Sequence, residues 1–118
     1  MSYILSIGTV NPPHSYSQTK TKQFVYELFH SKYPKIERLL TVFENAQIEE
    51  RFFSAPIEWF KQNHSFQEKN SRYIDVAIKL GIKAIKKAAN AQSIHLDDID
   101  AIFFISSTGI STPSIEAK

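Results

Sequence analysis

The sequence has no cysteine among its 118 residues. A disulfide framework, thiolate ligands for a metal ion and a cysteine nucleophile are therefore excluded for this chain. Glycine is also scarce, with three residues, and none of them builds a Gly-rich phosphate loop or a Gly-x-Ser-x-Gly nucleophile elbow. No two histidines stand at the spacing of a metal site, so the residues alone assign no catalytic or metal-binding motif.

Charge of one sign is not in large excess either, because 14 basic residues stand against 12 acidic ones and the net charge is +2. A nucleic-acid-binding protein is expected to carry a clustered basic excess. The longest plain apolar run, residues 101–105, is too short to cross a bilayer. Met1-Ser2-Tyr3 lacks the positive charge that opens a secretory signal peptide. We therefore expect a cytoplasmic protein that binds neither nucleic acid nor membranes.

Hydrophobic residues, in contrast, make up 42% of the chain and aromatic residues 13%, which is enough for a packed core. Apolar periodicity and turn residues predict an α/β arrangement in one ordinary domain's length of chain. Strands are expected at residues 3–9, 48–53 and 99–105. Helices are expected after a cap at Ser17, over 34–46, after Pro56, over 65–91 and from 112 or 113 to 118.

The segment 99–105 is apolar on both faces, as are central strands that helices cover on both sides. Such a strand needs neighbouring strands on both edges, and the final expected helix has only begun when the sequence stops. The sequence therefore predicts an α/β domain that is incomplete in this chain.

Two faces are expected on the long helix over 65–91. One carries small and apolar residues and should pack closely against a neighbour: Tyr73, Ile74, Ala77, Ile78, Gly81, Ala84, Ile85 and Ala88. The opposite face is rich in lysine, and we interpret it as the solvent side of the helix rather than as an anion-binding stripe. Its lysines are Lys79, Lys83, Lys86 and Lys87.

Candidate binding residues stand in two places. Arg38 and Arg51 could hold a phosphate, because a planar guanidinium donates two parallel hydrogen bonds, although the pattern alone favours ordinary surface or ion-paired arginines. The small polar residues 106–112 directly follow the segment 99–105, where ligands bind in open α/β sheets. The pattern leaves a binding pocket and helix capping by Ser111 or Thr112 both open.

Several stretches together resemble chalcone and stilbene synthase-like enzymes, the type III polyketide synthases of the thiolase superfamily. The resemblance follows the N-terminal portion of those enzymes and covers essentially the whole sequence in the right order. Its pieces are ILSIGTVNPP at 4–13, RLL at 38–40, FEN at 43–45, IEERFF at 48–53, EKN at 68–70 with Tyr73, DDIDAI at 97–102, STGI at 107–110 and Pro113-Ser114.

The resemblance implies a thiolase-like layered α/β/α/β/α fold, with residues 1–118 as the N-terminal portion of its N-terminal domain, truncated before the nucleophile. Enzymes of this family are acyltransferases that condense an acyl-CoA starter with malonyl-CoA in polyketide biosynthesis, and they form homodimers. A cysteine carries the growing chain, while a histidine and an asparagine stabilise the oxyanion. All three lie beyond this chain, so the resemblance implies a fragment that is inactive alone. It assigns no catalytic residue, no metal and no cofactor, with coenzyme A thioesters as substrates.

Supporting residues transfer by their position in these motifs. Arg38 matches a coenzyme A-binding position on the helix before the Ile-x-x-Arg element. Ser107 and Thr108 match the pair that lines the substrate pocket. Thr112 matches the residue that reaches across the dimer into the partner's cavity, and Arg51 is interpreted as structural.

Two alternatives stay open. A ketoacyl synthase III-type condensing enzyme shares the Ile-Gly-Thr opening and the Ile-x-x-Arg element. The Asn11-Pro12-Pro13 turn and the EKN sequence at 68–70 favour the polyketide branch. A non-catalytic module that binds an acyl thioester, or that pairs with a partner chain, is favoured by the absence of cysteine from this chain.

Overall fold

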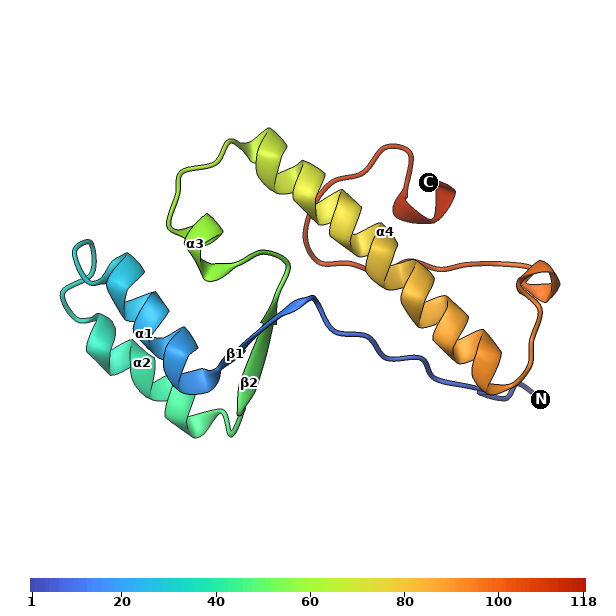
Figure 1. Ribbon diagram of the computed structural model, residues 1–118, viewed down its shortest axis with the longest axis horizontal. Coiled ribbons are helices and arrows are strands. Elements are labelled where there is room, and N and C mark those ends of the chain that lie inside the picture. Colours follow the sequence, from blue (N-terminus) through green and yellow to red (C-terminus); the bar gives the residue numbers. More distant parts are fainter. The chain divides into compact units, whose positions relative to one another are not determined.

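The computed structural model describes residues 1–118 and divides into two compact units. One unit is Pro12–Asn63, and the other combines Met1–Asn11 with His64–Lys118. Figure 1 shows α-helices and one small sheet, so the structure mixes helix and sheet and is compatible with the predicted α/β class. None of its helices is both long and apolar enough to span a membrane.

The sheet lies in the unit Pro12–Asn63 and has two antiparallel strands. β1 (His14–Ser17) pairs with β2 (Glu50–Phe53), with His14 opposite Phe53 and Ser17 opposite Glu50. β2 confirms the strand predicted at 48–53. β1 has no counterpart among the predicted strands, because its sequence HSYS lacks an alternating apolar signal. Its extended conformation is fixed by hydrogen bonds to a partner far along the sequence.

The first two predicted helices are confirmed in this unit. α1 (Gln18–Phe29) begins directly after Ser17, whose Oγ accepts a hydrogen bond from the backbone N–H of Lys20 at 3.2 Å. This contact satisfies one of the backbone donors that a helix start leaves without a partner. α2 (Ile36–Asn45) begins two residues later than predicted and packs against α1.

An aromatic cluster forms the core of the unit Pro12–Asn63. Phe60 ends α3 (Ile57–Phe60), the short helix predicted after Pro56. Its ring meets those of Phe24 and Phe53 at steep angles, with centroids 6.4 and 5.6 Å apart. Such edge-to-face pairs stabilise a core beyond the apolar area that they bury. The remaining large buried side chains are aliphatic: Ile36, Leu40 and Ile57.

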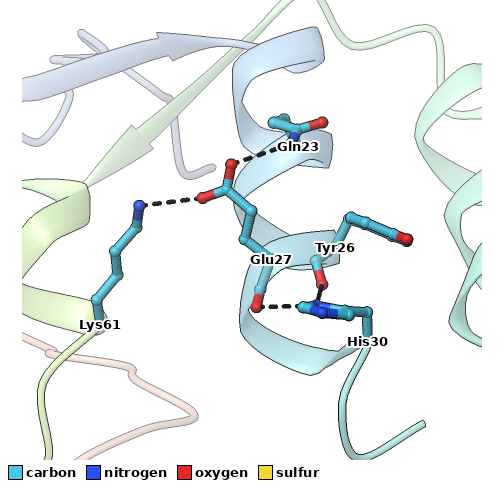
Figure 2. Close-up of polar contacts among 5 residues, drawn as sticks. All are labelled: Gln23, Tyr26, Glu27, His30 and Lys61. Atoms are coloured by element: carbon cyan, nitrogen blue, oxygen red, sulfur yellow. Dashed lines mark hydrogen bonds and ion pairs between the residues drawn. The ribbon is translucent and has the colours of Figure 1, made fainter. Parts of the chain in front are cut away.

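Polar contacts join α1 to the residue that follows α3 (Figure 2). The Glu27 carboxylate accepts hydrogen bonds from Gln23 Nε2 and Lys61 Nζ, both at 3.0 Å. These bonds, first the one from Gln23, lower the pKa of Glu27 below its ordinary value. His30 Nδ1 lies 3.1 Å from the carbonyl oxygen of Tyr26. Because a carbonyl oxygen can only accept, Nδ1 is the nitrogen that carries the hydrogen and donates this hydrogen bond.

The other unit is built on α4 (Phe66–Ala91), which confirms the long helix predicted over 65–91. Its start is a capping box, in which Ser65 Oγ accepts from the Glu68 N–H at 3.2 Å and a Glu68 carboxylate oxygen accepts from the Ser65 N–H at 2.7 Å. The predicted small and apolar face is half-buried along its length, and all four lysines of the opposite face are exposed. The two-faced interpretation of this helix is therefore confirmed.

Residues 3–9 do not form the predicted strand. They run irregularly beside α4 (Figure 1), and Ile4 is 85% exposed. Gly8 lies so close to the helix that a Cβ on it would stand 2.2 Å from the carbonyl oxygen of Ala84. Lys87 Nζ donates a hydrogen bond to the carbonyl of Thr9 at 3.0 Å. A strand needs a neighbour for its N–H and C=O groups, and the structure offers none to this segment.

Residues 99–105 do not form the predicted buried strand either. Phe103 is 88% exposed and Ile105 is 93% exposed. Nearer the start of the segment, Ile99 and Ile102 line a hollow of about 260 Å³ against α4. The apolar pattern is present on both faces, as the sequence predicts, but no second strand and no helix covers its far end.

Two short 3₁₀ turns stand in this part of the chain, one just before residues 99–105 and one near the last residue. η1 (Leu96–Asp98) leads into residues 99–105. η2 (Ile115–Ala117) stands where the sequence predicts the start of a helix, and its Ile115 is buried. The helix predicted from 112 or 113 is therefore present only as one tight turn.

Candidate functional site

The loop after residues 99–105 presents two hydroxyl side chains, those of Ser107 and Thr108, and both residues are exposed. Ser106 closes the loop on itself. Its Oγ–H donates to the carbonyl of Thr108 at 2.9 Å, and its Oγ accepts from the N–H of Thr108 at 3.3 Å. Gly109 follows with a φ of 76°, a backbone conformation that glycine adopts without steric cost. The result is a tight turn that points polar groups toward solvent.

α4 holds the far side of this loop through two residues one turn apart. The Asn70 side chain donates from Nδ2 to the carbonyl of Ile110, and its Oδ1 accepts from the N–H of Ile110, both at 2.8 Å. The Tyr73 ring lies directly against Gly109, because a Cβ added to that glycine would stand 2.1 Å from Tyr73 Cδ1. The loop is therefore fixed at two successive residues.

Thr112 follows the loop and is exposed. A hydrogen bond of 2.6 Å from Ser111 Oγ–H to the carbonyl of Pro113 spans it. A little further on, Ile115 is buried in η2, which packs against α4. Thr112 thus lies on a short surface segment between Ile110, which is hydrogen-bonded to α4, and Ile115 in η2, which packs against α4.

Arg38 lies on the first turn of α2 and is exposed. It borders a hollow of about 620 Å³ whose remaining lining is Lys32, Tyr33, Pro34, Lys35, Ile36 and Leu39. The backbone carbonyl of Arg38 accepts a hydrogen bond from Thr41 Oγ1 at 2.9 Å. The Arg38 guanidinium makes no hydrogen bond or ion pair in the structure. The guanidinium is therefore free to bind a ligand.

The charge around this hollow is positive and its wall is mixed. Lys32 and Lys35 bring two further cations beside Arg38. Tyr33 and Leu39 add exposed apolar surface. A ligand that combines phosphate groups with an organic body matches this arrangement, because arginine and lysine pair with phosphate oxygens while the apolar side chains cover carbon.

Arg51, the other candidate arginine, makes structural contacts. Its Nε donates to Gln18 Oε1 at 2.8 Å, and its guanidinium lies 5.1 Å from the centroid of the Phe43 ring. Gln18 in turn donates from Nε2 to the carbonyl of Phe43 at 2.6 Å. Arg51 therefore ties β2 to the start of α1 and to α2, which agrees with its structural interpretation.

The predicted site residues are divided between the two units. Ser107, Thr108 and Thr112 belong to the unit that contains α4, whereas Arg38 belongs to Pro12–Asn63. Within its own unit, each hydroxyl residue lies on the same surface segment, and Arg38 lies at a cationic hollow.

Sequence reasoning missed four residues of these arrangements: Lys32, Lys35, Asn70 and Tyr73. The lysines could have been found by counting basic residues around Arg38. The EKN sequence with Tyr73 was available as a family likeness, but its partner lies 40 residues away, and no local pattern indicates such a contact.

The chain was compared with known proteins, and no family model matches it. It is 42% identical to the protein named "Putative chalcone synthase" of Bacillus subtilis (strain 168), over 100% of this chain and 34% of that protein. It is 25% identical to a 1,3,6,8-tetrahydroxynaphthalene synthase of Streptomyces peucetius subsp. caesius, over 98% of this chain and 30% of that protein. A protein with the same name from Streptomyces coelicolor is 28% identical over 75% of this chain and 24% of its own length.

The chain spans about a third of the length of the first two of these relatives. With this identity along its full length, the chain belongs to the type III polyketide synthases, the chalcone synthase-like family. The resemblance drawn from the sequence motifs is confirmed.

Proposed function

We propose that this chain is part of an acyltransferase that condenses an acyl-CoA starter with malonyl-CoA in polyketide biosynthesis. The observation that carries the proposal is the 42% identity with the Bacillus subtilis protein over the whole of this chain. In this proposal residues 1–118 are the N-terminal portion of the N-terminal domain of a thiolase-like fold, ahead of the nucleophile. The complete enzyme is a cytoplasmic homodimer. The chain by itself is inactive, because it has no cysteine to carry an acyl group.

Arg38 has the role of binding the phosphates of coenzyme A in this proposal. Its guanidinium is free, and Lys32 and Lys35 stand at the same hollow. Coenzyme A carries several phosphate charges on a largely organic body, which suits three cations beside Tyr33 and Leu39. Arginine adds a bidentate grip on a phosphate that lysine cannot supply.

Ser107 and Thr108 have the role of lining the substrate pocket, and Thr112 that of entering the cavity of the partner subunit. Support comes from their exposure on a loop with a fixed backbone. A pocket wall must keep its shape while substrates of different size enter, and a loop that is hydrogen-bonded at both ends meets this requirement.

The coenzyme A assignment is tested by binding to the 118-residue chain. The chain is titrated calorimetrically with coenzyme A and with pantetheine. Comparing the two affinities gives the contribution of the phosphate-bearing part of coenzyme A to binding. We expect Arg38→Gln to weaken coenzyme A binding roughly tenfold, because a charge-assisted hydrogen bond contributes about 1.5–3 kcal/mol. Lys83→Gln, which removes one exposed charge from α4, is the matched control and should leave binding unchanged. If both variants lost the same affinity for coenzyme A, the loss would reflect the net charge of the chain and not a site at Arg38, which would contradict the assignment.

The condensation is tested in a chimera in which this chain replaces the matching third of the Bacillus subtilis protein. Consumption of malonyl-CoA with an acyl-CoA starter, followed by mass spectrometry of the products, measures turnover. Products in the chimera and in the unaltered Bacillus subtilis protein support the proposal. Products in the unaltered protein alone would contradict it for this chain.

A second candidate is a non-catalytic module that binds an acyl thioester, favoured by the absence of cysteine. It predicts coenzyme A thioester binding by the 118-residue chain together with a chimera that makes no product. The same two experiments therefore separate the candidates.

A further inference from the structure

The carboxamide of Asn70 matches the backbone of Ile110 atom for atom. An amide side chain places a donor and an acceptor side by side, as the N–H and C=O of one extended residue do. Both hydrogen bonds measure 2.8 Å, and reversing the amide would place a donor against a donor and an acceptor against an acceptor. Aspartate lacks the donor, and glutamine is longer by one methylene. The contact therefore favours asparagine among the natural residues.

Tyr73 adds a second contact one turn further along α4. Residues three apart on a helix share a face, so Asn70 and Tyr73 meet neighbouring residues of the loop. Gly109 accepts the Tyr73 ring only because it has no Cβ, and its φ of 76° disfavours any other residue for an independent reason. Two side chains of α4 thus contact consecutive loop residues, Tyr73 at Gly109 and Asn70 at Ile110.

We propose that Asn70 is a positioning residue for the loop that carries Ser107 and Thr108. Asn70 and Tyr73 hold the far side of the loop on α4, and Ser106 closes its near side through two contacts with Thr108. The two hydroxyl residues between these fixed points are left exposed in a single arrangement. The part of this inference that concerns substrate rests on the proposed function, in which Ser107 and Thr108 line the pocket.

The backbone contact is tested in the 118-residue chain by hydrogen exchange and NMR. We expect the Ile110 amide to exchange about tenfold faster in Asn70→Ala, because its N–H then loses the side-chain oxygen that accepts its hydrogen bond. Gln67→Ala, on the exposed first turn of the same helix, is the matched control and should leave this amide unchanged. Circular dichroism verifies that α4 remains folded in both variants.

A second variant disturbs the same contact through a substitution in the loop and not in the helix. Gly109→Ala leaves the sequence of α4 intact, and it should remove the nuclear Overhauser contacts between residue 109 and the Tyr73 ring. It should also raise the exchange of the Ile110 amide. Wild-type protection of that amide in both Asn70→Ala and Gly109→Ala would overturn the inference.

The consequence for substrate is tested in the chimera with the Bacillus subtilis protein. We expect Asn70→Ala, which removes both hydrogen bonds to Ile110, to change the preference between a short and a long acyl-CoA starter about tenfold, while decarboxylation of malonyl-CoA in the absence of starter stays near the wild-type rate. General structural damage would lower both activities together, and unchanged starter preference would overturn the positioning role. If the unmutated chimera makes no product, the proposed function fails, whereas the exchange experiment still decides whether Asn70 holds the loop.

Discussion

The two compact units differ in how they cover their apolar residues. In Pro12–Asn63, two strands pair with each other, and three helices place aromatic and aliphatic side chains in a common core. In the unit built on α4, the segments 3–9 and 99–105 have no paired strand, and Phe103 and Ile105 are almost fully exposed.

This difference follows from the range of the contacts that each element needs. A helix satisfies its own backbone, so α4 forms from a good cap and a two-faced pattern. A strand must find a partner, and β1 and β2 find each other within one unit. The apolar segments beside α4 carry strand-like sequences without such a partner, which leaves their side chains in water.

The largest expected effect tests whether the unit Pro12–Asn63 has a specific core. Leu40 is 4% exposed and its neighbour Leu39 is 67% exposed, so the two leucines form a matched pair. We expect Leu40→Ala to lower the free energy of unfolding by about 2–5 kcal/mol, and Leu39→Ala by less than about 0.5 kcal/mol. Urea unfolding followed by the fluorescence of Trp59, which lies in this unit, measures both. Equal effects would mean that the unit lacks a fixed core.

Two glycines of the other unit should respond in opposite directions to the same substitution. A Cβ at Gly8 would collide with the backbone of α4, whereas a Cβ at Gly81 meets nothing within 4 Å. We expect Gly8→Ala to destabilise this unit by about 1–3 kcal/mol and Gly81→Ala to stabilise it by up to about 1 kcal/mol. Thermal melts followed by circular dichroism measure the change. A neutral Gly8→Ala would show that residues 1–11 do not pack on the helix.

The start of α4 should depend on its capping box. We expect Ser65→Ala to cost about 1 kcal/mol and to speed amide exchange at Glu68, because the N–H of that residue loses its acceptor. Ser71→Ala, at an exposed position within the same helix, is the control, and it should be neutral or slightly stabilising since alanine is the better helix former. Unchanged exchange at Glu68 would contradict the cap.

The smallest expected effect is a loss of stability in acid that both units share. The hydrogen bond from Gln23 lowers the pKa of Glu27, and the backbone hydrogen bond from Ser65 lowers that of Glu68. Each carboxylate therefore stabilises the fold above its unfolded pKa, and this contribution disappears as the pH falls through the lower folded pKa. Urea midpoints measured from about pH 7 to about pH 3 should fall less steeply in Glu27→Gln and Glu68→Gln than in wild type. Identical slopes would contradict both assignments.

Much of the helical structure could be predicted because its signals are local. Ser17 and Ser65 cap the helices that they precede, and the apolar face of α4 and its lysine face are where the sequence places them. The strands at 3–9 and 99–105 were wrong for the opposite reason. Their composition indicates a strand, but strand formation depends on a partner that composition does not reveal.

The candidate site divides in the same way. The polar loop after residues 99–105 and the basic residue Arg38 can be selected from the sequence, and their binding roles stay predictions. The two hydrogen bonds between Asn70 and Ile110 cannot be selected, since they join residues 40 positions apart. The same holds for the lysines beside Arg38, whose shared hollow depends on how the chain turns into α2.

The sequence by itself determined the family, the absence of a cysteine nucleophile and the four α-helices. Sequence identity, composition and helix caps can all be found in the linear order of residues. Only the tertiary structure decided which segments pair as strands, which apolar residues remain exposed and which side chain holds the Ser107–Thr108 loop. Each of these depends on groups that are distant in sequence, and their hydrogen bonds and packing exist only when the fold brings them together.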